Sequence, residues 1–337
     1  MAWLYGWTYR KSHTINPASG AGTGYQIPIT AHYASGTDSG ADVYLNAHSR
    51  TDFNDVRFTS SDGTTLLDYW MEQVSSGSSA KFWVEIRDDL SSSSVTIYIY
   101  YGKVDAANMS NGVNTFLFFE DFEADLSAWT ITTYGTANII RSANHAFQGT
   151  YSAEDADAAT SYAYAQRTFT AKDLGVVMVW FYDDGNAKQQ VAAVDDGSTN
   201  IYIGRWDPQS SSYYAYQIGG TWYTSTVAIS KGWHKFEFIY GSGSSVILKI
   251  DDTQIYSGTP VASYSRMMFG DQWYGYSADG LGYYDCWCER KYVSPEPANG
   301  AWGNEESMNV GNSYPYLFVS VSKGEAGEYD LPSVNLI

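Results

Sequence analysis

The chain has 337 residues and a formal net charge of −18, with 37 Asp and Glu residues against 19 Lys and Arg residues. This balance disfavours nucleic acid and anionic membrane surfaces as partners, because proteins bind both through basic patches. The length indicates two or three domains, and the presence of only two cysteines excludes a disulfide-rich framework.

Strand patterns follow one another along the chain. Apolar residues alternate with polar or aromatic ones in 82–87, 95–100 and 246–250, as in strands with one buried face. The run 175–182 (GVVMVWFY) is continuously apolar and predicts a central strand that is covered on both sides. The Asp-Asp pair after residue 250 predicts a hairpin turn. No long stretch has helical period, so we predict an all-β protein.

Two changes in composition divide the chain. Residues 102–114 are polar and rich in turn-forming residues, and they separate a strand pattern from the apolar run 116–119. A second change falls at 295–304, after which the remaining segment is too short to form a domain alone. We therefore predict an antiparallel β-sandwich over 1–110, a second over 116–303, and a C-terminal tail over 304–337.

The two ends of the chain bear on localisation and assembly. Residues 1–7 lack the basic region and apolar core of a signal peptide, and no apolar stretch approaches the ~20 residues of a membrane helix. A virion protein needs no leader, which favours a virion surface protein. The tail carries one apolar strand pattern at 316–321, which could complete the edge of a neighbour's sheet.

The first ~110 residues resemble a family of prokaryotic and viral surface proteins, the domain of unknown function 2341. This resemblance implies a surface-exposed module with little catalytic equipment. The matching segments, in order, are Trp7–Lys11, Gly24–Ile29, Asp52–Phe58, Leu67–Trp70, Phe82–Val84 and Ile97–Gly102.

Residues ~116–303 resemble a laminin-G-like, concanavalin A-like jelly roll. Proteins that combine the two modules are adhesins, cell-surface proteins and archaeal or bacterial virus proteins, so the resemblance implies binding, often to glycans. The matching segments are Phe119–Glu123, Leu126–Trp129, Gly232–Phe236, Val246–Ile255, Tyr284–Asp285, Arg290–Pro297 and Trp302–Gly303.

One acidic cluster suggests a structural calcium ion. Asp121 and Glu123 point the same way if they lie in a strand, and carboxylate oxygens are typical calcium ligands. In jelly rolls of this kind, an acidic residue of the opening strand and one of the closing strand share the ion, which implies Asp121 or Glu123 together with Asp285. The alternative that stays open is an ordinary polar strand edge.

The spacing of ionisable residues argues against catalysis. Glycosidases on this kind of jelly roll need alternating acidic residues with carboxylates ~5 Å apart, whereas Glu120 and Glu123 would face opposite sides of a strand. The five histidines show no ligand spacing, and no nucleophile motif is complete. Cys286 and Cys288 are expected to be buried thiols, although their redox state stays open.

Aromatic residues offer the best candidate binding surface. A flat ring can cover the apolar face of a sugar while neighbouring Asp and Gln side chains bond its hydroxyl groups. The alternative for each ring is a place in the core or in a subunit interface. The candidate ligand-binding residues are Trp206, Tyr214, Tyr216, Trp222, Trp273 and Tyr274.

Three functions follow from these features. The first is a non-catalytic protein of a virion or cell surface that binds glycans or other cell-surface polymers through its jelly roll. The second is a structural subunit of a virion or filament whose sandwiches and tail mediate self-assembly. The third is a glycan hydrolase. The sequence favours the first function, outside the cell and without membrane insertion.

Overall fold

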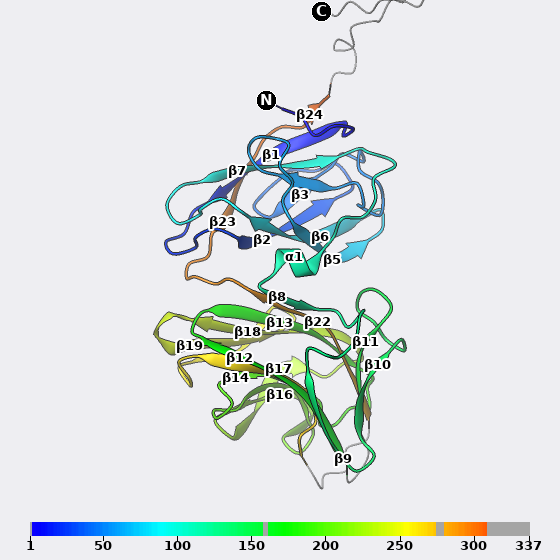
Figure 1. Ribbon diagram of the computed structural model, residues 1–337, viewed down its shortest axis with the longest axis vertical. Coiled ribbons are helices and arrows are strands. Elements are labelled where there is room, and N and C mark those ends of the chain that lie inside the picture. Colours follow the sequence, from blue (N-terminus) through cyan, green and yellow to red (C-terminus); the bar gives the residue numbers. More distant parts are fainter. Residues whose placement is uncertain (1, 158–160, 274–279, 309–337) are drawn as a thin grey trace, which may run out of the picture.

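The computed structural model describes residues 2–157, 161–273 and 280–308. Apart from the four-residue helix α1 (Gly112–Thr115) and the 3-10 turn η1 (Ser242–Ser244), its regular elements are strands. Figure 1 shows them arranged as two β-sandwiches that follow one another along the long axis of the molecule. The predicted all-β architecture of two sandwiches is therefore confirmed. No helix in these ranges has the length and apolarity needed to span a membrane.

The first sandwich pairs a five-stranded sheet with a four-stranded sheet. All neighbouring strands are antiparallel except β2 and β3, which are parallel. The five-stranded sheet has the order β23 (Ala298–Trp302), β1 (Tyr9–Asn16), β7 (Val95–Tyr101), β4 (Arg57–Thr59), with β24 (Glu306–Ser307) also on β1. The four-stranded sheet has the order β3 (Asp42–Tyr44), β2 (Tyr25–His32), β6 (Ser79–Ile86), β5 (Tyr69–Ser75).

The chain returns to the first sandwich after the second one is complete. β23 pairs with β1, and the ring of Trp302 stacks on that of His13 at a centroid distance of 3.6 Å. Arg10 in turn forms an ion pair with Glu306 of β24. The sequence had placed 298–303 at the end of the jelly roll and 304–307 in a tail. This prediction was wrong because hydrogen bonding to β1, rather than a local pattern, determines where residues 298–307 lie.

The second sandwich pairs an eight-stranded sheet with a seven-stranded sheet. The first of these has the order β10 (Asn138–Ser142), β11 (Ser152–Asp157), β22 (Gly280–Arg290), β13 (Gly175–Asp183), β18 (Gly232–Gly241), β19 (Ser245–Ile250), β20 (Thr253–Gly258), with β8 (Phe118–Glu120) also on β22. The other has the order β17 (Thr221–Ala228), β16 (Ser210–Ile218), β15 (Ile201–Trp206), β14 (Val191–Asp195), β21 (Tyr264–Gly270), β12 (Tyr162–Lys172), β9 (Thr130–Tyr134).

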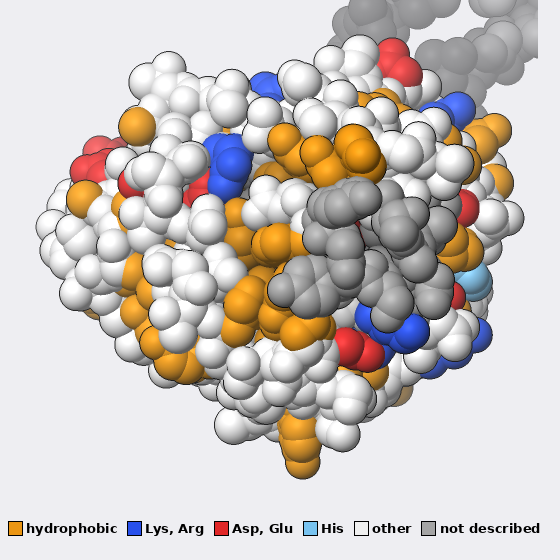
Figure 2. Space-filling view, turned by 90° about the horizontal axis from the view of Figure 1, so that it is seen from below, with side chains coloured by type: hydrophobic (Ala, Val, Ile, Leu, Met, Phe, Trp, Pro, Cys, Tyr) orange, Lys and Arg blue, Asp and Glu red, His pale blue; other side chains and the backbone are white. Residues whose placement is uncertain are grey.

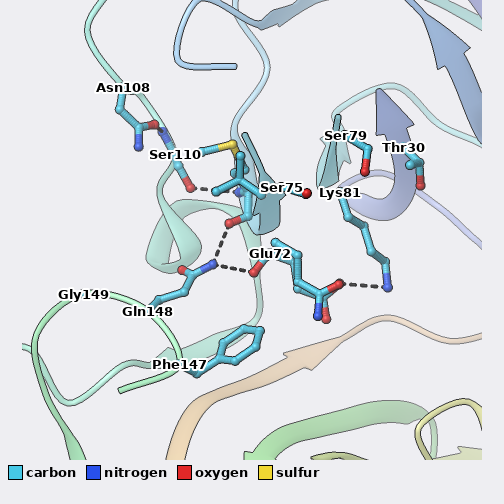
Figure 3. Close-up of a pocket in the computed structure, with 13 residues that line it drawn as sticks. Thr30, Glu72, Ser75, Ser79, Lys81, Asn108, Ser110, Phe147, Gln148 and Gly149 are labelled. Atoms are coloured by element: carbon cyan, nitrogen blue, oxygen red, sulfur yellow. Dashed lines mark hydrogen bonds and ion pairs between the residues drawn. The ribbon is translucent and has the colours of Figure 1, made fainter. Parts of the chain in front are cut away.

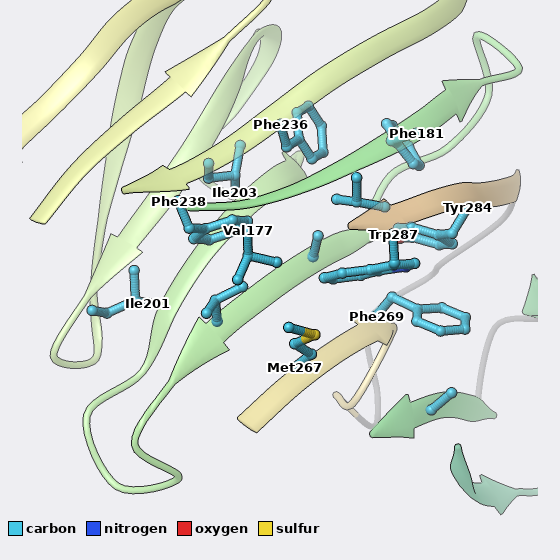
Figure 4. Packing of buried hydrophobic residues seen from close by; sticks show 14 of the residues in the cluster. Val177, Phe181, Ile201, Ile203, Phe236, Phe238, Met267, Phe269, Tyr284 and Trp287 are labelled. Carbon is cyan, nitrogen blue, oxygen red and sulfur yellow. The ribbon is translucent and has the colours of Figure 1, made fainter. Parts of the chain in front are cut away.

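The continuously apolar strand β13 is central and is covered on both faces, as predicted. Val177, Val179 and Phe181 point into the core between the two sheets, part of which Figure 4 shows. The alternate residues Met178 and Trp180 belong to a different apolar cluster on the opposite face. A strand whose two faces are both covered by other parts of the protein needs no polar face. This explains why apolar and polar residues do not alternate along β13.

That opposite face packs against the first sandwich. Trp70 and Trp83, from β5 and β6, share one cluster with Met178, Trp180 and other residues of the eight-stranded sheet. α1 lies between the two sandwiches in Figure 1, next to β8 of the eight-stranded sheet. Both cysteines, Cys286 and Cys288, are free and buried in this cluster, which confirms their predicted role as small apolar residues. The first sandwich thus covers the outer face of the eight-stranded sheet, and the seven-stranded sheet lies on the far side of the second sandwich.

Candidate functional site

The outer face of the seven-stranded sheet carries a cluster of aromatic side chains. Tyr202 and Trp206 lie on the same face of β15. Trp222 comes from β17, which is two strands away in the sheet. Trp273 follows β21 and closes over the same face. Antiparallel pairing of β15, β16 and β17 brings these side chains together, since residues two apart on a strand share a face. Figure 2 looks at this end of the molecule and shows hydrophobic side chains gathered beside the residues drawn in grey.

The rings of this outer aromatic cluster pack closely. Trp206 and Trp222 are parallel to within 5°, with centroids 4.6 Å apart. Trp273 lies 4.5 Å from Trp206 at 59°, and 5.6 Å from Tyr202 almost at a right angle. Trp206 is buried beneath its neighbours, whereas Trp222 and Trp273 are half-buried. The outermost rings therefore present apolar surface on a rigid, stacked base.

Polar groups border the cluster. Gln272 donates a hydrogen bond of 2.6 Å to the hydroxyl of Tyr202, and Asp207 accepts one from Arg205. Burial and the charge of Asp195 raise the pKa of Tyr202, so its hydroxyl keeps its proton. Gln217, opposite both Tyr202 and Trp222, is buried, and its Oε1 has no hydrogen-bond partner among the described residues. The face thus combines rings with donors and acceptors, which suits a hydroxylated ligand.

Two of the predicted ligand-binding residues lie elsewhere. Tyr214 is fully buried in the core, where its hydroxyl contacts Asp183. Tyr216 packs on the core side of β16, beside Tyr223 and Tyr256. The assignment of Tyr214 to a binding surface was wrong because its ring is fully buried in the core, and strand alternation places the half-buried Tyr216 on the same side of β16, away from the outer aromatic cluster. Trp206, Trp222 and Trp273 do come together, and Tyr274 lies outside the described residues.

The acidic residues proposed as calcium ligands hold a loop. Glu123 Oε1 accepts hydrogen bonds of 2.7 Å from the amides of Thr150 and Tyr151. Asp285, which is buried beside a bulge of β22, accepts hydrogen bonds from the amides of Phe147, Gln148 and Cys286. The two carboxylates thus fix opposite ends of residues 147–151, a segment that we call the anchored loop.

In this structure the three carboxylates bind backbone amides, and calcium binding by them stays a prediction. Asp121 Oδ1 accepts a hydrogen bond from the amide of Glu123. Each of the three predicted ligands therefore has at least one carboxylate oxygen that accepts a hydrogen bond from a backbone amide. Within the ranges that the structure describes, no group of three or more His, Cys, Asp or Glu side chains is arranged to hold a metal ion. Burial raises the pKa of Asp285 to about 7 despite its amide partners. A protonated or amide-bonded Asp285 is a poor calcium ligand.

A serine, a histidine and an aspartate meet where β17 leads into β18. Ser230 Oγ lies 3.2 Å from His234 Nε2, and His234 Nδ1 lies 2.6 Å from Asp251 Oδ2. Sequence reasoning missed this contact, since it treated the histidines one by one. The signal was available, because pairing GWHKFEF with VILKI as a hairpin places Asp251 beside the start of β18.

The hydrogen bonds of His234 decide what this group can do. His234 Nε2 also lies 2.9 Å from the backbone carbonyl of Ser230, which can only accept a hydrogen bond. Burial lowers the pKa of His234, but the bonds to Asp251 and to this carbonyl outweigh it, and the pKa is raised overall. A general base needs a free lone pair at Nε2. A hydrogen bond to the carbonyl requires the hydrogen on Nε2, and in that tautomer the arrangement acts as a clamp on the turn.

Comparison with protein families matches one part of the chain. Residues 52–132 match the family described as domain of unknown function (DUF2341). The resemblance read from the sequence is therefore confirmed for this family, although the match starts at residue 52 and extends past residue 110 into β9. No curated protein sequence matches the chain.

Several solved structures resemble this chain at low identity. The cellulose-induced protein Cip1 is 13 % identical, with a TM-score of 0.42, over 52 % of this chain and 98 % of its own. A sialidase is 14 % identical, with a TM-score of 0.38, over 61 % of this chain and 20 % of its own. An endo-β-1,4-glucuronan lyase from the fungus Trichoderma reesei is 11 % identical, with a TM-score of 0.38, over 53 % and 96 %. No functional conclusion follows from likenesses this low.

Proposed function

We propose that this is a non-catalytic surface protein, of a virion or a cell, that binds glycans on the outer face of its seven-stranded sheet. The observation that carries the proposal is the stack of Trp206 on Trp222 with Trp273 beside it, on the sheet that faces away from the first sandwich. A half-buried ring on a rigid base can cover the apolar face of a sugar without losing side-chain entropy on binding.

The charge of the protein narrows the ligand class. A net charge of −18 repels sulfated or carboxylated polymers at a distance. Gln272, Asp207 and Gln217 offer uncharged or acidic hydrogen-bonding groups next to the rings. Neutral glycans therefore suit this face better than acidic ones.

The arrangement of ionisable groups supports a binding role over a hydrolytic one. Glu123 is engaged with the anchored loop. His234 directs both ring nitrogens at acceptors. We therefore retain the expectation that the protein lacks hydrolase activity.

A neutral-glycan array followed by calorimetry tests the proposal. We expect binding that Trp222→Ala or Trp273→Ala weakens by about tenfold or more, the scale of one lost stacking contact. Tyr223→Ala is the matched control, because Tyr223 is the next residue on β17 and faces the other side. Unchanged binding in the two tryptophan variants, or an equal loss in the tyrosine variant, would contradict the proposal.

A further inference from the structure

A second site is built where the two sandwiches meet. A cleft of about 770 Å³ opens between the outer face of the four-stranded sheet and the anchored loop. Its volume falls in the range of small-molecule sites, which occur preferentially between domains. Figure 3 shows Phe147 and Gln148 on one side of the cleft and Thr30 and Ser79 on the other.

The wall formed by the first sandwich is a row of polar strand residues. Thr30 and Gln73 both lie directly opposite Lys81 in the pairing of β2, β6 and β5. Ser75 lies opposite Ser79 in the next row. Hydroxyl, amide and ammonium groups therefore repeat across the sheet at the strand spacing of ~4.8 Å.

Glu72 gives this wall an unused acceptor. It lies at a bulge of β5, its side chain is 1 % exposed, and its Oε2 accepts hydrogen bonds from Lys81 Nζ at 2.8 Å and Trp83 Nε1 at 3.0 Å. In the part of the chain that the structure describes, its Oε1 has no hydrogen-bond partner. A buried carboxylate oxygen without a donor is costly, so a ligand donor that reaches Oε1 after a shift of the Lys81 side chain would be favoured.

The opposite wall supplies an aromatic ring in a fixed position. Phe147 stacks on Trp180 at 3.9 Å, and amide bonds to Asp285 hold its backbone. Gln148 is fixed to the first sandwich through Trp70 and the carbonyls of Met71 and Glu72. The cleft is therefore preorganised on both sides, which reduces the entropy lost on binding.

We propose that this cleft binds a short neutral saccharide, independently of the outer aromatic cluster. The ring of Phe147 faces the apolar side of a sugar, and the polar row meets its hydroxyl groups, one of which donates to Glu72 Oε1. Glu72 and Lys81 already neutralise each other, so the site offers no net charge to an ionic ligand. Hydroxyl-rich, uncharged ligands fit this combination of groups best.

The test uses the full chain with Trp222→Ala, which impairs the outer face, and a panel of neutral tetrasaccharides (cello-, xylo-, manno- and laminaritetraose). Calorimetry and saturation-transfer NMR should detect binding of at least one of them. Ser75→Trp places a large ring at the exposed rim of the cleft and should weaken this binding by about tenfold or more. Ser92→Trp, at an exposed position in the loop before β7, is the matched control and should leave it unchanged.

Glu72→Gln provides a second probe, because it keeps the shape of the side chain and changes its hydrogen-bonding groups. A Ser75→Trp protein that binds as tightly as its Ser92→Trp counterpart would overturn the proposal, as would a failure of every tetrasaccharide to bind the Trp222→Ala protein. Loss of all binding through Trp222→Ala alone would assign the saccharide to the outer face. The experiment therefore distinguishes a failure of the cleft proposal from a failure of the proposal for the outer aromatic cluster.

Discussion

Gln148 of the second sandwich accepts a hydrogen bond of 2.9 Å at its Oε1 from the indole Nε1 of Trp70 in the first. The Nε2 of the same amide donates to the carbonyls of Met71 and Glu72, each at 2.6 Å. One side chain thus satisfies three polar groups of β5, and it lies on a loop held by the buried Asp285 and the half-buried Glu123. The two sandwiches are coupled through this contact as well as through their shared apolar cluster.

Gln148→Ala should loosen that coupling. Trp70 is buried, so its N–H would lose its partner, and a buried unsatisfied group costs roughly 1–3 kcal/mol. We expect the free energy of unfolding to fall by about that amount in a denaturant titration. Gln73→Ala, an exposed glutamine on the same strand, is the control and should change little. Equal stability of the two variants would show that Gln148 does not link the sandwiches.

Asp285 should make the stability depend on pH. Its pKa rises from an ordinary value of 3.8 to about 7, chiefly because of burial, so the folded protein keeps a proton that the unfolded chain releases. Stability should therefore fall as the pH rises from about 4 to about 7, by at most roughly 4 kcal/mol. Asp285→Asn removes this titration. Unfolding measured across that window should show a flatter curve for the variant than for the native protein.

Strands were predicted correctly from the sequence where the local order of apolar and polar residues reflects which faces of the strand are buried. β7 and β19 alternate because one face is buried, and β13 does not because both faces are. β23 was assigned to the wrong sandwich, since ANGAW carries no such alternation and its partner β1 lies near the other end of the chain. A strand determined by its partner alone leaves no local signal.

The same distinction applies to the candidate site. Trp206 and Trp222 could be grouped from their closeness in sequence, but which neighbours shared their face depended on the register of β15, β16 and β17. Tyr214 and Tyr216 lie in the same span and point into the core. The cleft was not predictable at all, because its walls come from strands of one sandwich and a loop of the other.

His234 should stabilise the protein at low pH. Its pKa is raised above 6.5, so the protonated ring gains its bonds to Asp251 and the Ser230 carbonyl, and this stabilisation is complete below about 6.5. It should be lost as the pH rises through the higher folded-state value. Asp251→Asn should remove the dependence and cost about 1 kcal/mol, since the 41 % exposure of Asp251 allows solvent screening. Thermal unfolding on both sides of the transition checks the sign.

The Ser230→Ala variant tests whether Ser230, His234 and Asp251 act as a structural clamp or as a catalytic group. The hydroxyl is exposed, and the Nε2 of His234 is already directed at a carbonyl. The variant should keep the stability of the native protein within about 0.5 kcal/mol and show the same background rate with p-nitrophenyl acetate. A native rate above that of Ser230→Ala would mean that the serine is activated, and the non-enzyme proposal would then be abandoned.

Calcium should not be needed for the stability of the second sandwich. Glu123 Oε1 and both oxygens of Asp285 accept backbone amides, and lone pairs used in this way are not free for a cation. Excess EDTA should therefore leave the melting temperature unchanged. Glu123→Ala should lower the free energy of unfolding by roughly 1–3 kcal/mol, because the amides of Thr150 and Tyr151 lose their acceptor. If instead EDTA lowered the melting temperature of the native protein and not that of Glu123→Ala, the carboxylate would be acting as a metal ligand, as the sequence resemblance implied.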